Sequence, residues 1–350
     1  MAVMLVAYFL RRFFFQATIY FAILTALFLA CNVVAKLPVI YDFWVIPVLL
    51  WFMMPVVALF ALPLAASMAL LSVIAAHKVH DELLVTVFLP RARRSLVAAG
   101  LLFGLVTSLC YGVLSFVAAP QGYALGKKLL INAARDHLVH LPPNVFHSPL
   151  PMVSFFVRDK QLSSDGNVLF NHLMLVISTK QGERMLFTAS RGSFVQRQLQ
   201  LEQGRVVMLK GTQVHSAAFE KTQVDVDALF AKEDPLKGLN QAKLFNVQTL
   251  LAVYANNNEA FVELHKRIAQ SLWQLLLCAL ALFMALITTG SSLLSSVGVS
   301  GILFLISYVL VAAAQAFVGQ PIYALLLLYV PLLGALLLAG VCARAAFMNR

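Results

Sequence analysis

Residues 268–343 form a run of 76 residues without a single lysine, arginine, aspartate or glutamate. A charged side chain at the centre of a bilayer costs about 2.5–3.5 kcal/mol even on the mildest scale, so lipid-spanning segments exclude these residues. The composition of the whole chain agrees, since 61% of its residues are hydrophobic and 12% are charged, about half the usual charged share. The sequence therefore predicts an integral membrane protein.

The charges are unevenly distributed along the chain. Residues 121–262 contain fifteen basic and eleven acidic residues, a mixture typical of a soluble domain, whereas the other 208 residues contain eleven basic and four acidic ones. The basic excess therefore lies mostly around the ends of hydrophobic segments. This placement favours membrane orientation and contact with anionic lipid, and it argues against a nucleic-acid partner.

Six hydrophobic segments are expected to span the membrane, in two groups of three. The first runs over 13–34, and the second, over 44–76, is interrupted by Pro47, Pro55 and Pro63, which favour a bent helix. The third covers 95–119 and continues after Pro120 as a helical stalk. Spans four to six are expected at 268–288, 301–317 and 322–342.

Between the two groups, short β-type runs alternate with turn sequences. The runs cover 152–157, 168–178, 184–189, 206–209 and 213–226, and the turns include Ser164-Asp165-Gly166-Asn167. Regular short strands with turn signals predict an all-β sandwich or jelly roll. We therefore divide the chain into residues 1–120, an inserted β domain at 121–262 with a helical stalk, and residues 263–350.

The loops between spans set the expected orientation. With six spans, Arg11 and Arg12, the basic cluster between Lys78 and Arg94, and the final Arg344 and Arg350 all fall on one side. The positive-inside rule assigns that side to the cytoplasm, which places the β domain on the far side of the membrane.

No catalytic or metal-binding pattern is present. The Gly122–Lys128 segment resembles a phosphate loop only superficially, because three residues separate its glycines and Lys128 stands where Ser or Thr would bind magnesium. We expect no ATP site, cofactor or metal in this chain. The cysteines show no ligand spacing, so we interpret them as small buried hydrophobic residues: Cys31, Cys110, Cys278 and Cys342.

The short segment between spans two and three is the strongest local signal. Asp81 and Glu82 precede a dense apolar run that includes Leu84, Val85, Phe88 and Leu89. Such apolar surface either lies on the membrane or docks into the groove of a partner, and we favour docking. Lys36, at the outer end of span one, either snorkels to the interface or contacts an anionic lipid headgroup.

At this point the chain resembles a known family, the lipopolysaccharide export permeases LptF/LptG, over nearly its whole length. The matching pieces occur in the family's order and are Leu62-Pro63-Leu64, Glu82-Leu83-Leu84-Val85, Ala119-Pro120-Gln121-Gly122 and Glu263-Leu264-His265-Lys266-Arg267-Ile268. Pro90 departs from the pattern, because a glycine usually stands there, and the loop 289–300 lacks a frequently seen basic residue.

The resemblance implies a non-enzymatic permease subunit of the bacterial inner membrane, with a periplasmic β-jellyroll domain. It implies a heterodimer with a paralogous permease over a dimeric cytoplasmic ATPase, which binds the ATP and magnesium. Segment 79–90 would be the coupling helix, with Glu82 as its acidic contact. Lipopolysaccharide would enter between the two permeases, beside spans one and five, and pass to periplasmic β-jellyroll proteins.

The β domain would supply an apolar path for the acyl chains of the lipid. Its candidate residues could equally be the core of the sandwich: Phe155, Leu169, Leu173, Leu175, Phe187 and Val207. Two alternatives from other classes stay open. One is a membrane-anchored scaffold or receptor without transport. The other is a secondary transporter, which usually carries ionisable residues inside its spans, although spans four to six have none.

Overall fold

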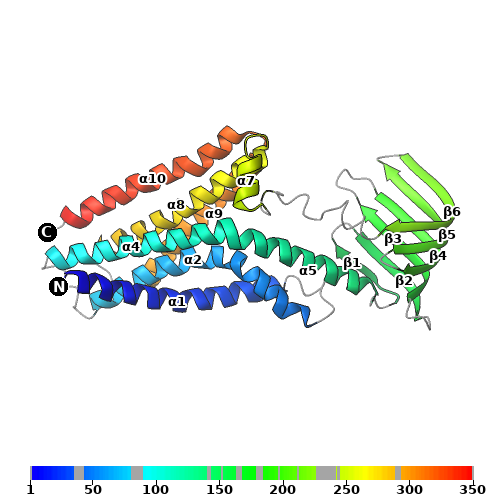
Figure 1. Ribbon diagram of the computed structural model, residues 1–350, viewed down its shortest axis with the longest axis horizontal. Coiled ribbons are helices and arrows are strands. Elements are labelled where there is room, and N and C mark those ends of the chain that lie inside the picture. Colours follow the sequence, from blue (N-terminus) through cyan, green and yellow to red (C-terminus); the bar gives the residue numbers. More distant parts are fainter. Residues whose placement is uncertain are drawn as a thin grey trace. The chain divides into compact units, whose positions relative to one another are not determined.

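The computed structural model describes residues 2–34, 43–79, 90–139, 143–150, 153–162, 168–178, 184–195, 198–210, 213–225, 242, 245–287 and 293–348. It divides into two compact units. One contains residues 1–32, 51–124 and 242–350, and the other contains residues 33–50 and 125–241. The first unit is a helical bundle and the second holds a β-sheet (Figure 1).

The longest helices have predominantly apolar sequences. In chain order they are α1 (Ala2–Val34), α2 (Val45–Val79), α4 (Pro90–Val113), α5 (Ala119–Val139), α7 (Val247–Val253), α8 (Asn258–Ile287), α9 (Leu293–Ala316) and α10 (Pro321–Met348). Within the described residues, five stretches have the length and apolarity to cross a membrane, at 3–34, 45–77, 92–130, 258–287 and 321–345. The shorter apolar stretch 301–316 belongs to α9, so five of the six expected spans meet these criteria.

Prolines modify the helices without ending them. Helix α2 continues through Pro55 and Pro63, and the Ser67 hydroxyl donates to the Pro63 carbonyl at 2.9 Å. Between α4 and α5 lies one π-helical turn, η2 (Leu114–Ala118), which ends two residues before Pro120. A proline ring would collide with the carbonyl four residues earlier in a regular helix, and a wider turn relieves this collision. The expected third span and stalk thus form a nearly continuous helical run.

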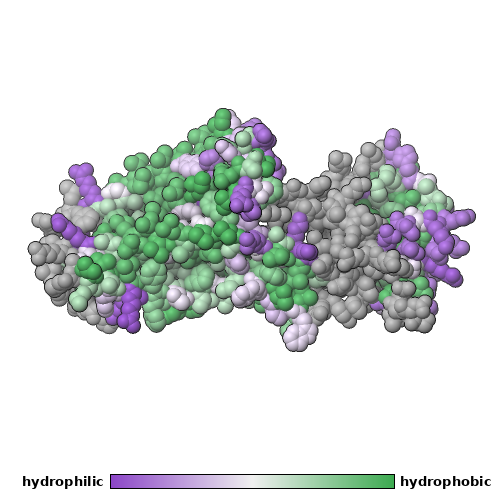
Figure 2. Space-filling model, in the orientation of Figure 1, coloured by the Kyte–Doolittle hydropathy of each residue, from purple (hydrophilic) through white to green (hydrophobic). Residues whose placement is uncertain are grey.

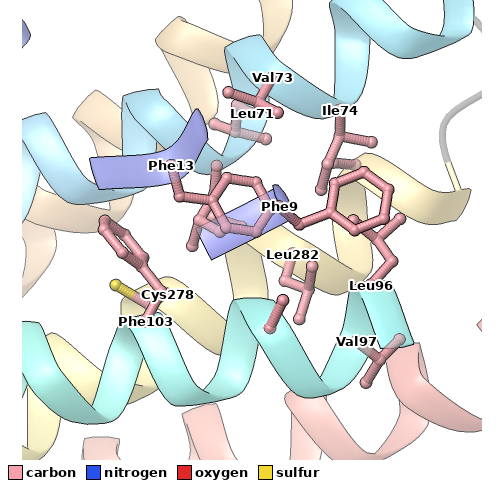
Figure 3. Close-up of a cluster of buried hydrophobic side chains, with 14 of the residues drawn as sticks. Phe9, Phe13, Leu71, Val73, Ile74, Leu96, Val97, Phe103, Cys278 and Leu282 are labelled. Carbon is pink, nitrogen blue, oxygen red and sulfur yellow. The ribbon is translucent and has the colours of Figure 1, made fainter. Parts of the chain in front are cut away.

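Two large apolar clusters pack the described part of the bundle. In the first, Phe9 and Phe13 of α1 insert between α2, α4 and α8, where they meet Ile74, Phe103 and Leu282 (Figure 3). The second joins α8, α9 and α10 around Trp273, Leu277 and Leu328. Elsewhere hydrophobic residues cover most of the visible face of the bundle in Figure 2. In the most apolar 18-residue stretch of α1 only 6% of the residues are buried, whereas the corresponding stretch of α8 is 56% buried. Helix α8 is therefore central and α1 is peripheral.

Glycines allow α4 and α8 to approach closely. A Cβ at Gly100 would lie 2.8 Å from Leu282, and one at Gly104 would lie 2.9 Å from the Cβ of Cys278. Small residues four apart are typical of such contacts between membrane helices. A hydrogen bond also joins the two helices, because the Ser108 hydroxyl donates to the Ser271 carbonyl at 2.7 Å.

The cysteine interpretation is wrong for two of the four residues. Cys278 is buried and Cys342 is partly buried, but Cys31 and Cys110 are exposed in the isolated chain. The reason is that both lie on the outside of long membrane helices, where lipid replaces the protein core as the apolar environment.

Among the described residues, the second unit contains six antiparallel strands in the order β1-β2-β3-β4-β5-β6. They are β1 (Phe146–Leu150), β2 (Val153–Leu162), β3 (Val168–Ser178), β4 (Arg184–Val195), β5 (Gln198–Lys210) and β6 (Gln213–Asp225). Each strand pairs with its neighbours in sequence, so the described strands form a meander whose edges are β1 and β6 (Figure 1). Each of the five expected runs overlaps a strand, although residues 152 and 226 at the ends of two runs lie outside the described residues, and β1 is additional.

The sheet changes its side-chain alternation along one row of residues. In β3 the buried residues are Val168 and Phe170 and then Leu173, Leu175 and Ile177, so the alternation shifts by one at His172. His172 has a φ of 50°, and Gln203 of β5 has a φ of 49°. Left-handed residues of this kind re-aim a strand. One apolar face therefore continues across the bend.

Candidate functional site

A buried group of charges lies near the beginning of α8. Glu263 and Arg267 are each only 3% exposed, and Lys266 is 8% exposed. The Glu263 carboxylate accepts hydrogen bonds from Lys266 Nζ and, at 3.1 Å, from Arg267 Nε. The positions 263, 266 and 267 are one helical turn apart, which places all three side chains on one face. Buried charges are tolerated when they are paired and hydrogen-bonded, and here the single carboxylate pairs with both cations and neutralises one of their two positive charges.

Arg267 also holds the segment that precedes α8. Its guanidinium donates to the carbonyl of Phe245 at 3.0 Å and to that of Ala242 at 3.3 Å. The same guanidinium lies 5.9 Å from the ring centre of Phe116 in η2. Arg267 therefore ties together three elements: the segment returning from the β domain, the π turn and α8.

A cavity opens beside this charged group and is formed entirely within the bundle. Its volume is about 170 Å³, and its walls come from α2, α4, η2, α5, α8 and α9. One wall is polar, with Glu263, Lys266 and Gln274, and the opposite wall is apolar, with Val56, Leu59 and Phe304. The cavity is therefore suited to an amphipathic group.

Sequence reasoning missed this site. The sequence analysis used the Glu263–Arg267 segment only as one of the pieces that resemble the family. It also expected span four to begin at residue 268, whereas α8 begins at Asn258. A usable signal was present: one carboxylate precedes two cations at three- and four-residue spacing, immediately before 76 uncharged residues. That spacing predicts ion pairs between the carboxylate and the two cations on a single helix face.

The candidate lipid-path residues lie on both faces of the sheet. Phe155, Leu173 and Leu175 are buried together on the apolar face, and Phe187 packs against them while partly buried. Leu169 is 41% exposed between the buried Val168 and Phe170, and so lies on the opposite face. Val207 pairs with Leu186, the neighbour of Phe187 in β4. Since successive strand residues alternate between faces, Val207 also lies on the opposite face. The structure therefore brings four of the six residues together.

A lysine lies on the same apolar face. Lys160 of β2 pairs in register with Phe170, and directly paired residues share a face. Burial lowers the pKa of the Lys160 ammonium group, because desolvation disfavours its charged form.

The remaining predicted site residues lie outside the described ranges. They are Lys36 and the segment with Asp81, Glu82, Leu84, Val85, Phe88 and Leu89. The structure therefore adds nothing to their assigned roles.

The fold defines a class of protein: a multi-pass helical membrane protein with an inserted antiparallel β-sheet and a polar cavity within its bundle. The sequence identifies the family more closely, since residues 7–345 match the lipopolysaccharide export system permease LptF/LptG. The chain belongs to this family and is a permease of the lipopolysaccharide export system, a transmembrane subunit without an ATPase domain. A search of the curated proteins gave no match.

Proposed function

We propose that this permease removes lipopolysaccharide from the bacterial inner membrane and passes it to periplasmic β-jellyroll proteins. A separate dimeric cytoplasmic ATPase, which binds the ATP and magnesium, powers the step. Extraction needs an external source of energy, because bringing acyl chains into water costs about 0.8 kcal/mol per CH₂. The observation that carries the proposal is the continuous apolar face of the sheet, which joins Phe155, Leu173, Leu175 and Phe187 in the same chain as the membrane bundle.

The sheet is proposed to be part of a jellyroll domain, residues 121–262, that lies in the periplasm. Its last described strand, β6, is a 13-residue edge strand. Edge strands have unpaired backbone groups that can pair with a strand of another protein. This supports transfer to a bridge of similar β domains, with acyl chains moving along the apolar face.

The bundle is proposed to pair with a paralogous permease. The least packed membrane helix, α1, has exposed apolar residues along its length, including Phe15, Ile23 and Leu27. Helix α9 likewise exposes Ile302, Leu305 and Val309. These faces support the assignment of spans one and five to lateral gates, with α9 completing a six-span bundle. Lys36 would contact the lipid headgroup at the outer end of span one.

The lipid path can be tested by site-specific photo-crosslinking in cells that export lipopolysaccharide. A photoreactive phenylalanine analogue replaces Phe187 on the apolar face or, as the matched control, Val207 on the opposite face. We expect a lipopolysaccharide adduct at position 187 that depends on an active ATPase, and at most a trace at 207. Equal adducts at both positions, or none at 187, would remove the sheet from the path and favour a scaffold or receptor.

The orientation can be tested by cysteine labelling of intact cells in a variant without native cysteines. Ser216 is an exposed residue of β6 and Arg94 is an exposed residue near the beginning of α4, and each is replaced by cysteine in turn. An impermeant thiol reagent should label position 216 and should reach position 94 only after the cells are permeabilised. The reverse pattern would contradict a cytoplasmic location for residues 1–12 and 78–94.

A further inference from the structure

The chain that forms the β-sheet leaves the helical bundle and returns to it through two connections. The outgoing connection is the run α4, η2 and α5, which passes out of the bundle unit after residue 124. The returning connection re-enters that unit at residue 242 and leads through α7 into α8. One side chain, Arg267 of α8, contacts both connections.

The returning connection is folded, and we call its described part, residue 242 and residues 245–257, the return elbow. Asn246 caps α7, because its side-chain oxygen accepts a hydrogen bond from the backbone N–H of Thr249 at 2.8 Å. Asn257 accepts in the same way from the backbone N–H of Glu259, at 2.8 Å, at the beginning of α8. Fully buried side chains pack the elbow against α8: Ala242, Leu250 and Ala260. The elbow therefore has a defined shape on the bundle.

Three nitrogens of the Arg267 guanidinium hold the return elbow to α8. Nη1 donates to the Phe245 carbonyl at 3.0 Å and Nη2 donates to the Ala242 carbonyl at 3.3 Å. Nε donates to the Glu263 carboxylate at 3.1 Å. A guanidinium is a planar fork with five N–H donors, whereas a lysine ammonium is a single point of charge on a flexible stem. Lysine at position 267 would keep the charge and lose this set of three hydrogen bonds.

The same guanidinium contacts the outgoing connection at its irregular turn. Its central carbon lies 5.9 Å from the ring centre of Phe116 in η2, within the range of a cation–π interaction. In η2 the backbone N–H of Ala119 donates to the carbonyl of Leu114, five residues earlier. Turns of this kind are places where helices kink, and they are frequent at functional sites. Arg267 therefore contacts the outgoing helix where that helix can change direction.

We propose that Arg267 is a positioning residue for export. It holds both connections of the β-sheet to the first turns of α8, so that a shift of α8 moves the outgoing and the returning chain together. Movement of the bundle would then reach the sheet as one displacement and would not be lost in either connection. This inference rests on the proposed function, in which the bundle delivers lipid to the sheet, and it adds a residue that links the two.

The contact network can be tested without transport, in the full-length protein without native cysteines. Spin labels are attached at Ala124→Cys in α5 and Leu251→Cys in α7, because both residues are exposed and lie on the two connections. The distance between the labels should be narrowly distributed in the parent protein. With Arg267→Lys, which keeps the charge, the distribution should become at least about twofold wider, because the forked set of hydrogen bonds is lost.

Ser271→Ala is the matched control, one turn further along α8. It removes the hydrogen bond from the Ser271 hydroxyl to the Arg267 carbonyl, at 2.9 Å, and leaves the guanidinium in place. The label distribution should stay narrow. Phe116→Leu removes only the ring contact, so it should widen the distribution less than Arg267→Lys does, and it tests the proposal if Arg267→Lys does not fold.

The consequence for export is measured with the complete complex in proteoliposomes, as lipopolysaccharide transferred to a soluble β-jellyroll acceptor per ATP hydrolysed. Arg267→Lys should lower this ratio at least about threefold, the effect of losing roughly one hydrogen bond, while ATP hydrolysis continues. A general loss of stability would lower transfer and hydrolysis together and would leave the ratio unchanged. The Ser271→Ala complex should have the ratio of the parent complex.

Two results would overturn the proposal. One is a label distribution that stays narrow in both Arg267→Lys and Phe116→Leu, which would mean that Arg267 does not hold the connections. The other is an unchanged ratio of transfer to hydrolysis in Arg267→Lys, which would mean that the contacts only stabilise the bundle. Failure of the proposed function is a separate result: the parent complex itself would transfer no lipid, and the label distances would still decide whether Arg267 holds the connections.

Discussion

Glu263 and Arg267 form an ion pair, with Oε1 and Nε 3.1 Å apart, in which each side chain is 97% buried within the helical bundle. Lys266 shares the same carboxylate, so a single anion pairs with two cations near the beginning of a membrane helix and leaves a net charge of +1. The pair is asymmetric in its consequences. Loss of Arg267 leaves Glu263 with Lys266, whereas loss of Glu263 leaves two buried cations together.

Glu263→Gln is therefore expected to destabilise the protein strongly. Removing one partner of a buried ion pair typically costs on the order of 3–5 kcal/mol, and here two like charges are left one turn apart. Thermal unfolding of the purified protein in detergent measures the effect. The control is Glu259→Gln, an exposed carboxylate on the same helix, which should change stability by no more than ~0.5 kcal/mol. Equal unfolding midpoints for both variants would show that the buried carboxylate does not contribute to stability.

Gly122→Ala is expected to disrupt the contact between α2 and α5. A Cβ at Gly122 would lie 2.4 Å from the carbonyl oxygen of Phe52, a backbone atom that cannot move without shifting a helix. Overpacking of this kind costs roughly 1–3 kcal/mol. Gly112→Ala is the matched control, since its nearest neighbour, the Ser271 hydroxyl, would be 3.5 Å away. It should stabilise by about 0.4–1 kcal/mol through the unfolded state. Opposite shifts of the unfolding temperature would support this reasoning, and equal shifts would refute it.

Gly204→Ala is expected to loosen the β-sheet at its bend. A Cβ there would lie 2.2 Å from the Thr188 carbonyl oxygen and 2.3 Å from the ring of Phe219, so the ring that covers the glycine would be displaced. We expect a loss of roughly 1–3 kcal/mol, seen as faster limited proteolysis between residues 125 and 241 of the intact protein. Gly192→Ala, with contacts no closer than 3.4 Å, should be cut at nearly the wild-type rate. Cleavage equally fast in both would mean that the bend does not depend on Gly204.

Glu82→Lys is expected to uncouple or release the ATPase while the membrane bundle stays folded. Reversing a charge at a desolvated docking contact costs several kcal/mol, whereas at an exposed site it costs only ~0–1 kcal/mol. Phe88→Ala should weaken the same complex by roughly 2 kcal/mol, because it removes an apolar anchor. Co-purification of the ATPase and lipid-stimulated turnover measure both effects, with monodispersity in detergent as the folding control. Normal complexes in both variants would mean that residues 81–89 only lie on the membrane.

The sequence by itself determined the class of this protein and the positions of its main elements. The uncharged run 268–343 and the other apolar segments predicted membrane helices, because a bilayer excludes charge over about twenty consecutive residues. The turn sequences placed five of the strands, since strand ends are set locally. The order of short family pieces, from Leu62 to Ile268, was sufficient to indicate the permease family.

Only the tertiary structure decided which side chains meet. Leu169 and Val207 looked equivalent to Leu173 in the sequence, but the bend at His172 and Gln203 sets which face each strand residue occupies. Helix α8 begins ten residues before the apolar run, so the charges at 263–267 are buried and not at a solvated helix end. Trp273 and Gln274 line a cavity because five other segments surround them. Such contacts depend on distant parts of the chain, and local sequence patterns carry no information about them.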